Sequence, residues 1–231
     1  YLNNYDDPIL LGLSGLPGSG KSSLGHWIDN ASLELGWPVK VISLDDFYLS
    51  GDSLDISMRG NPWLVPRGLP GSHSMEIISD SLDKFLQTGN LSCPKFDKSL
   101  RNGLGDRSGK HESKPKIVIL EGWFVGCYPL EPNDFQVFIN NEPALHSSLT
   151  VEEKKYRIIV QDNLGKYTSI WSRLKKIWHL KAHEILYTSD WKRQQERDMF
   201  IRKGAALTGD KLESFIRMIS ASIPHHSLSD I

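Results

Sequence analysis

The most constraining feature of the sequence is a glycine-rich octapeptide near its start. Residues 15–22 read Gly-Leu-Pro-Gly-Ser-Gly-Lys-Ser and match the pattern G-x-x-x-x-G-K-[ST]. The octapeptide follows an apolar run at residues 9–14, which predicts a strand, and leads into a predicted helix at residues 22–35. A simple glycine-rich turn would explain the glycines but not Lys21 and Ser22 together. The sequence therefore predicts a loop that binds the phosphates of a nucleoside triphosphate.

Each residue type in this loop has a physical role. Glycines allow backbone N–H groups to turn toward phosphates, and the start of the following helix adds unpaired amides and the positive end of its dipole. Lys21 is expected to reach the β- and γ-phosphates, and the Ser22 hydroxyl to ligate Mg²⁺. The predicted nucleotide-binding residues are Gly15, Leu16, Pro17, Gly18, Ser19, Gly20, Lys21, Ser22 and Ser23.

Composition narrows the class of protein. A chain of 231 residues suits one domain, which we assign to residues 1–231. The formal net charge of −1 argues against a nucleic-acid partner, and no apolar run reaches the roughly 20 residues that span a bilayer. Cys93 and Cys127 have no neighbouring zinc-ligand pattern, which favours a reducing compartment. We expect a cytoplasmic protein without a membrane partner, or a plastid protein if the source has plastids; the oligomeric state is left open.

Periodicity predicts an α/β fold with a doubly wound, mostly parallel sheet flanked by helices. A β-rich run at residues 39–44 follows the helix at residues 22–35, and strand, helix, strand in this order implies parallel pairing. Residues 116–120 and 135–139 read as further buried strands. Further helices are expected at residues 75–86, 151–187 and 210–221, the second with a break near Gly165 and an aromatic stripe that belongs to the core.

Two long irregular segments and one charged segment remain. Residues 50–74 and 89–115 are rich in glycine and serine, and we interpret them as loops that shape a substrate site. Residues 188–210 are predicted to form a helical lid. Arg193 and Arg197 share one helix face there, so they could cover the phosphates, with Arg193 as a catalytic cation; the alternative is a solvated charged face.

Acidic residues follow two of the predicted strands. Asp45 and Asp46 come after residues 39–44, and Glu121 after residues 116–120. Because ligands of open parallel sheets bind beyond the carboxyl ends of the strands, we expect these acids beside the phosphate loop. Asp45 is predicted to accept the proton of the hydroxyl group that receives the phosphoryl group. Glu121 is expected to hold Mg²⁺ or to hydrogen-bond the molecule that carries this hydroxyl. Asp46 could take either role. Asp45 and Glu121 join Ser22 as the predicted metal ligands. A turn or cap, or a solvent-facing strand end, is the plain alternative.

With these residues identified, the chain resembles the glycerate kinase group of P-loop kinases, relatives of phosphoribulokinase, uridine kinase and pantothenate kinase. The resemblance covers residues 9–224. Beyond the phosphate loop it rests on Ser-Leu-Asp-Asp-Phe-Tyr at 43–48, Arg-Gly-Leu-Pro-Gly-Ser-His at 67–73, Pro-Lys-Phe-Asp-Lys-Ser at 94–99, Gly-Asp-Arg at 105–107, Leu-Glu-Gly-Trp-Phe-Val-Gly at 120–126 and residues 191–196.

The resemblance implies a P-loop NTPase fold, with ATP and Mg²⁺ as cofactors. It makes Asp45 the catalytic base and Glu121 its acidic partner. It also implies that the segments at 67–73 and 95–98 shape the acceptor site, and a cation pair such as Arg67 and Lys95 would suit the carboxylate of glycerate. The candidate substrate residues are Asp46, Tyr48, Arg67, His73, Lys95 and Asp97.

Two features depart from the group. Ser74 stands where the group usually has Asp, which leaves the acceptor open. The chain ends at Ile231, before the final strand expected in the group, so either the sequence is trimmed or the sheet is one strand short.

The resulting hypothesis is a kinase that transfers the γ-phosphoryl group of ATP directly and in line to a small molecule, with D-glycerate as the leading acceptor. The sequence offers no evident nucleophile with an adjacent base, so no covalent phosphoenzyme is expected. The alternatives are a kinase for a nucleoside or a pantothenate-like acceptor, and an ATP-binding regulatory protein without turnover. A switch GTPase is disfavoured because the chain has no N-K-x-D segment.

Overall fold

The central element of the fold is a four-stranded parallel sheet. The computed structural model describes residues 7–139, 148–181, 187–203 and 206–229. The sheet has the order β2-β5-β1-β6, with β1 (Ile9–Gly15), β2 (Val39–Ser43), β5 (Ile117–Gly122) and β6 (Ile177–Leu180). β1 pairs with β5 and β6, and β2 pairs with β5, each in parallel. The predicted α/β fold with a parallel sheet is confirmed.

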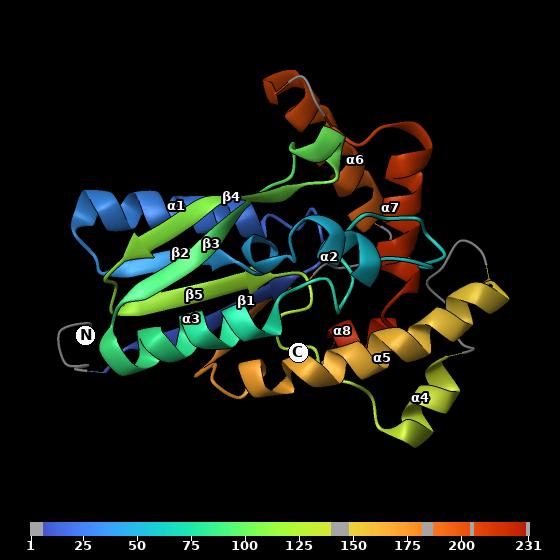
Figure 1. Cartoon of the computed structure of the whole chain (residues 1–231), viewed down its shortest axis with the longest axis horizontal. Helices are drawn as coiled ribbons and strands as arrows, with labels where there is room; N and C mark the ends of the chain where they lie inside the picture. The colour runs from blue at the N-terminus through green and yellow to red at the C-terminus, as the bar shows by residue number, and fades with distance from the viewer. Residues whose placement is uncertain (1–6, 140–147, 182–186, 204–205, 230–231) are drawn as a thin grey trace.

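Helices flank this sheet. In Figure 1 the sheet lies between α1 (Lys21–Leu35) above it and α3 (Met75–Thr88) and α5 (Val151–Trp171) below it. The C-terminal part of the chain adds α6 (Tyr187–Lys203), α7 (Gly209–Ala221) and the short α8 (His225–Ser229). Arg157, fully buried in α5, fixes α7 by donating a hydrogen bond from Nε to the carbonyl of Ala221 at 2.6 Å.

The main core forms where α5 meets the strands. The predicted aromatic stripe is buried at Tyr167 and Trp171, whose rings stack with their centroids 5.5 Å apart. Phe124, just after β5, packs edge-on against Tyr167 at 5.2 Å. The stripe ends there, because Trp178 in β6 is 49% exposed.

Helix α1 packs through its smallest residues rather than through its apolar ones. Gly25 and Ser32 are buried, and a side chain at Gly25 would meet Val41 at 3.0 Å. Trp27 is 79% exposed and Leu35 is 59% exposed. The spacing of apolar residues thus predicted the helix correctly but did not indicate its buried face.

Two predicted elements of the second half were wrong. Residues 135–139 were expected to be a strand. Residues 135–138 instead belong to α4 (Pro132–Phe138), and Ile139 follows it. Proline stands at its favoured position in the first turn of this helix. Residues 151–187 were expected to be helical with a break near Gly165, but α5 continues unbroken through Gly165 and ends at Trp171. The following segment forms β6, an edge strand of four residues that pairs with β1. Residues 182–186 of this prediction lie outside the described residues.

Both predicted loops contain regular structure. Residues 50–74 include α2 (Gly51–Ser57). Residues 89–115 are largely an antiparallel hairpin of β3 (Leu91–Asp97) and β4 (Asp106–Ser113), with the 3-10 helix η3 (Arg101–Gly103) at its tip. β4 is polar and contains Gly109, and the segment between the strands adds Gly103 and Gly105, so composition alone suggested irregular chain. The predicted lid at residues 188–210 overlaps α6.

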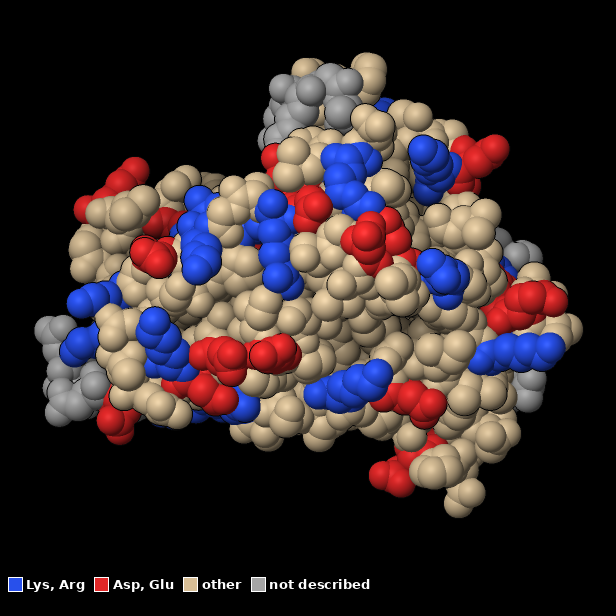
Figure 2. All heavy atoms as spheres, viewed as in Figure 1, with Lys and Arg blue, Asp and Glu red and all other residues tan. Residues whose placement is uncertain are grey.

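The surface carries mixed charge. Figure 2 shows Lys and Arg interspersed with Asp and Glu over the face that it draws. Among the described residues no helix has both the length and the hydrophobicity that crossing a membrane requires. Cys93 and Cys127 are buried free thiols.

Candidate active site

A cavity of about 640 Å³ opens at the carboxyl edge of the parallel sheet. The strand register explains why distant segments meet there, because Ser14 lies opposite Gly122 and Ser43 lies opposite Glu121. The loop after β1, the residues after β2 and the end of β5 therefore share one edge. The predicted residues that line the cavity are Pro17, Gly18, Gly20, Lys21, Ser22, Ser23, Asp45, Tyr48 and Glu121.

The phosphate loop joins β1 to α1. Gly18 and Gly20 have φ angles of 85° and 93°, which only glycine adopts without strain. Lys21 is 7% exposed and donates from Nζ to the carbonyl of Leu16 at 3.2 Å. Burial lowers the pKa of Lys21, although Glu121 and Asp45 oppose this shift. A bound anion would supply the charge partner that this buried ammonium otherwise finds only in part.

Glu121 joins the loop to β2. Its Oε1 accepts hydrogen bonds from the Ser22 hydroxyl at 3.1 Å and from the Ser43 hydroxyl at 3.0 Å. Within the described ranges no three His, Cys, Asp or Glu side chains group as a metal cage. Mg²⁺ at nucleotide sites needs no such cage, because one or two carboxylates and the phosphates hold it. The Ser22 and Glu121 oxygens therefore fit a Mg²⁺ that arrives with a nucleotide.

Asp45 lies in the 3-10 helix η2 (Leu44–Phe47), directly after β2. Its Oδ1 accepts from the Tyr48 hydroxyl at 2.8 Å, and its Oδ2 accepts from Lys98 Nζ at 2.6 Å. Burial opposes ionisation, but the Lys98 charge and these hydrogen bonds outweigh it and hold the pKa of Asp45 below its usual value. Asp45 is thus an ionised carboxylate facing the cavity.

Asp46 has a different role from Asp45. Its Oδ1 accepts from the backbone N–H of Phe96 at 3.1 Å, and its Oδ2 lies 3.9 Å from His111 Nε2. Burial raises the pKa of Asp46. Because both contacts are to the β3–β4 hairpin, Asp46 anchors the hairpin beside the site and does not line the cavity.

Tyr48 and His73 form a layer behind Asp45. Their rings stack with centroids 4.5 Å apart, and His73 Nδ1 lies 2.8 Å from the Tyr167 hydroxyl. Burial lowers the pKa of His73 to about 4, so the ring is neutral at physiological pH. Tyr48 reaches the cavity, whereas His73 supports it from behind.

The remaining predicted substrate residues do not line the cavity. Arg67 is buried and donates to the carbonyls of Gly103 and Leu104 at 2.7 and 2.9 Å, so it holds the hairpin tip. Lys95 is exposed on β3. Asp97 accepts from the backbone and hydroxyl of Ser99, which shapes the turn after β3. Neither Arg67 nor Lys95 lines the cavity, so the structure does not support the predicted cation pair there.

Helix α6 covers the phosphate loop. A side chain at Gly18 would come within 2.5 Å of Trp191 Cβ, so only glycine allows this approach. Lys192 lines the cavity, pairs with Glu196 at 2.6 Å and lies 4.9 Å from the centre of the Phe215 ring. Burial lowers the pKa of Lys192, while Glu196 raises it.

The arginines predicted for the lid point elsewhere. Arg193 pairs with Glu213 of α7 at 2.8 Å and with Asp190 at 3.3 Å, outside the cavity. Arg197 hydrogen-bonds Gln194 at 2.8 Å. Lys192, one residue before Arg193, and Lys98 line the cavity, and neither of them was predicted from the sequence as a site residue.

Ser74 is a helix cap. Its hydroxyl accepts from the backbone N–H of Ile77 at the start of α3, at 3.5 Å. Serine and aspartate are both favoured at this position for the same reason. The departure from the group's Asp therefore has a structural account and does not argue against turnover.

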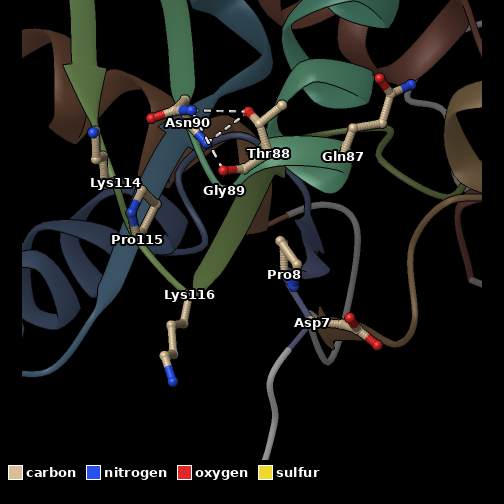
Figure 3. Close-up of a pocket in the computed structure, with 9 residues that line it drawn as sticks. All are labelled: Asp7, Pro8, Gln87, Thr88, Gly89, Asn90, Lys114, Pro115 and Lys116. Carbon is tan, nitrogen blue, oxygen red and sulfur yellow. Dashed lines mark hydrogen bonds between the residues drawn. The ribbon is translucent and has the colours of Figure 1, made fainter.

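A second hollow lies at the opposite edge of the sheet (Figure 3). It measures about 510 Å³ and lies between the residues before β1, the α3–β3 turn and the β4–β5 turn. Its hydrogen bonds join Asn90 to Thr88 of the same turn. The charged residues that line it, Asp7, Lys114 and Lys116, are exposed. The candidate site is therefore the cavity at the carboxyl edge.

Comparisons with known proteins point to kinases. No family model matches the chain. The chain is 30% identical over 220 residues to the uncharacterized kinase mug58 of Schizosaccharomyces pombe, covering 90% of this chain and 77% of that protein. It is 27% identical over 222 residues to the chloroplastic D-glycerate 3-kinase of Arabidopsis thaliana, covering 90% of this chain and 45% of that protein. A solved D-glycerate 3-kinase from Cryptococcus neoformans is 25% identical with a TM-score of 0.81, covering 98% of this chain and 80% of that chain.

Proposed function

The chain belongs to the group of P-loop kinases that contains mug58 and D-glycerate 3-kinase, and from this premise we propose that it transfers the γ-phosphoryl group of ATP to a hydroxyl group of D-glycerate. The protein is an ATP-dependent kinase for a small molecule with a hydroxyl group. The names of two relatives support the choice of acceptor. One observation carries the proposal: Lys21, Ser22, Asp45 and Glu121 line one cavity.

We assign the roles by the charge that each group can stabilise. Lys21 and the loop amides bind the β- and γ-phosphates, and Lys192 of α6 balances the charge that spreads over the transferring phosphoryl group. Asp45, which is already ionised, accepts the proton of the acceptor hydroxyl as the new oxygen–phosphorus bond forms. The phosphoryl group moves directly from ATP to the acceptor, and ADP leaves.

Mg²⁺ is part of this proposal. The Ser22 hydroxyl and the Glu121 carboxylate would hold it, and the bound ion would neutralise phosphate charge. Asp45 is kept for the acceptor proton, because a carboxylate bound to Mg²⁺ would be a poor base. Glu121 would also keep the Ser22 and Ser43 hydroxyls oriented, because all three already share hydrogen bonds.

A coupled ADP-release assay tests the proposed function. The full chain is incubated with ATP, Mg²⁺ and a panel of D-glycerate, L-glycerate, glycerol, uridine and pantothenate. We expect ADP release that depends on D-glycerate and has the highest kcat/KM with it. Release that depends on uridine or pantothenate would identify a different acceptor. Tight ATP binding with no dependence on any acceptor would instead support a regulatory protein.

The lid cation gives a second test. Lys192→Met should reduce kcat by about 100-fold, because an ammonium near the transferring phosphoryl group is lost. Arg193→Met is the matched control on the next residue, and it should change kcat by less than about threefold, since it removes only exposed ion pairs. Steady-state kinetics at saturating ATP compare the two. A larger loss in Arg193→Met would restore the role that the sequence suggested for that arginine.

A further inference from the structure

Lys98 is the cation of the β3–β4 hairpin that reaches the candidate active site. Of the other described hairpin cations, Arg101 pairs with Asp55 and Arg107 donates to the carbonyl of Tyr48. Lys95 and Lys110 are exposed and do not line the cavity. Lys98 lines it and holds Asp45 at 2.6 Å.

The backbone on both sides of Lys98 is anchored by contacts with other parts of the protein. Asp46 binds the backbone of Phe96, two residues before Lys98. Arg67 binds the carbonyls of Gly103 and Leu104 beyond it. Gly105 packs so closely on the Phe96 ring that a side chain there would come within 2.3 Å of it. The backbone near Lys98 is therefore anchored, and the lysine side chain is the part that can change partner.

The pair with Asp45 is accessible from the cavity. Lys98 and Asp45 both line it, and their side chains are 51% and 30% exposed. An acceptor bound in the cavity can therefore reach the Lys98 ammonium directly.

The other lysines of the cavity are already assigned to phosphate. Lys21 belongs to the phosphate loop, and Lys192 lies on the helix that covers this loop. Lys98 instead contacts the carboxylate that faces the acceptor hydroxyl in the proposed mechanism. An acceptor that carries its own carboxylate offers Lys98 an equivalent partner of the same charge.

We propose that Lys98 selects hydroxy-acid acceptors: its ammonium passes from the Asp45 carboxylate to the acceptor carboxylate and so holds the acid group of the acceptor in the cavity. The inference rests on the proposed kinase function and adds the residue that recognises the acid group. It replaces the predicted pair of Arg67 and Lys95.

The test compares D-glycerate with glycerol, which has the same carbon chain but a neutral alcohol in place of the carboxylate. Lys98→Met should lower kcat/KM for D-glycerate by about 10- to 100-fold, mainly through KM, because a charge-assisted bond to the acid is lost. Its kcat/KM for glycerol should not fall, and its KM for ATP should not change. Lys98→Arg should recover part of the preference, and Lys110→Met, on the same hairpin, should match the wild type.

Equal losses with D-glycerate and glycerol, or a rise in KM for ATP alone, would overturn the inference. If wild-type protein turns over a neutral acceptor in preference to D-glycerate, both the proposed acceptor and the role of Lys98 are refuted. If no acceptor supports turnover, the proposed function fails. The Lys98 inference is then decided by thermal denaturation with ATP present: D-glycerate, but not glycerol, should stabilise the wild type, and neither should stabilise Lys98→Met.

Discussion

Replacing Asp45 with asparagine should reduce kcat by about 10²- to 10⁴-fold while ATP affinity stays close to that of the wild type. Asparagine keeps the size of the side chain and can still accept from the Tyr48 hydroxyl, but it cannot take a proton. The measurement is single-turnover phosphoryl transfer at saturating ATP and D-glycerate, with ATP binding followed separately by calorimetry.

Asp46→Asn is the control for this prediction, because it changes the neighbouring carboxylate in the same way. Its amide oxygen can still accept from the Phe96 N–H, so the hairpin anchor is retained. We expect a far smaller loss than for Asp45→Asn. Similar rates in the Asp45 variant and the wild type would remove Asp45 from the mechanism.

The second large effect concerns Lys21. Lys21→Met should lower kcat/KM for ATP by about 10²- to 10³-fold, because the cation that stabilises the negative charge on the β- and γ-phosphates is lost. Lys40→Met is a suitable control, since Lys40 pairs with Asp29 outside the cavity. Initial rates over a range of ATP concentrations give the comparison.

Stability separates a catalytic effect of Lys21 from a folding defect. Burial lowers the pKa of Lys21, so the charged ammonium at neutral pH costs folding free energy in the absence of ATP. Methionine fills similar space without that cost, and the ligand-free variant should unfold at the same Tm as the wild type or a higher one. A lower Tm together with lost activity would indicate that Lys21 is needed for the fold.

The parts of the site that could be predicted from sequence are those with local spacing. The phosphate loop is a continuous pattern, and strand ends carry Asp45 and Glu121 to the same edge by the rules of parallel sheets. The structure places all of these at one cavity. Their placement needed no knowledge of how distant segments pack.

Lys98 could not be identified because its position depends on how the hairpin folds. The residue follows the last paired residue of β3, Asp97, in the turn that leads to η3. The pairing also shifts between Lys95 and Phe96, and such a bulge changes which side chains face the same way. Composition also suggested a loop, so no register was expected at all. The choice of Lys95 over Lys98 therefore had no geometric basis.

The lid shows the same limit on a helix. Residues 192 and 193 point about 100° apart on a helix, so their roles depend on its rotation about its axis. Contacts made by distant residues set that rotation. Trp191 packs closely against Gly18 of the phosphate loop, and Glu213 of α7 forms an ion pair with Arg193. In α4, by contrast, Pro132 was a local signal of a helix start that the apolar pattern obscured.

The fate of the γ-phosphoryl group tests the central claim most directly. ATP labelled with ³²P at the γ-position is mixed with the protein, Mg²⁺ and D-glycerate, and the products are separated after a single turnover. The account predicts label in phosphoglycerate and none on the protein. Two results would contradict direct transfer in this cavity: label retained on the protein, or label released only as inorganic phosphate. If the protein is labelled, Ser22 and Ser43, whose hydroxyls both contact Glu121, are the first positions to check.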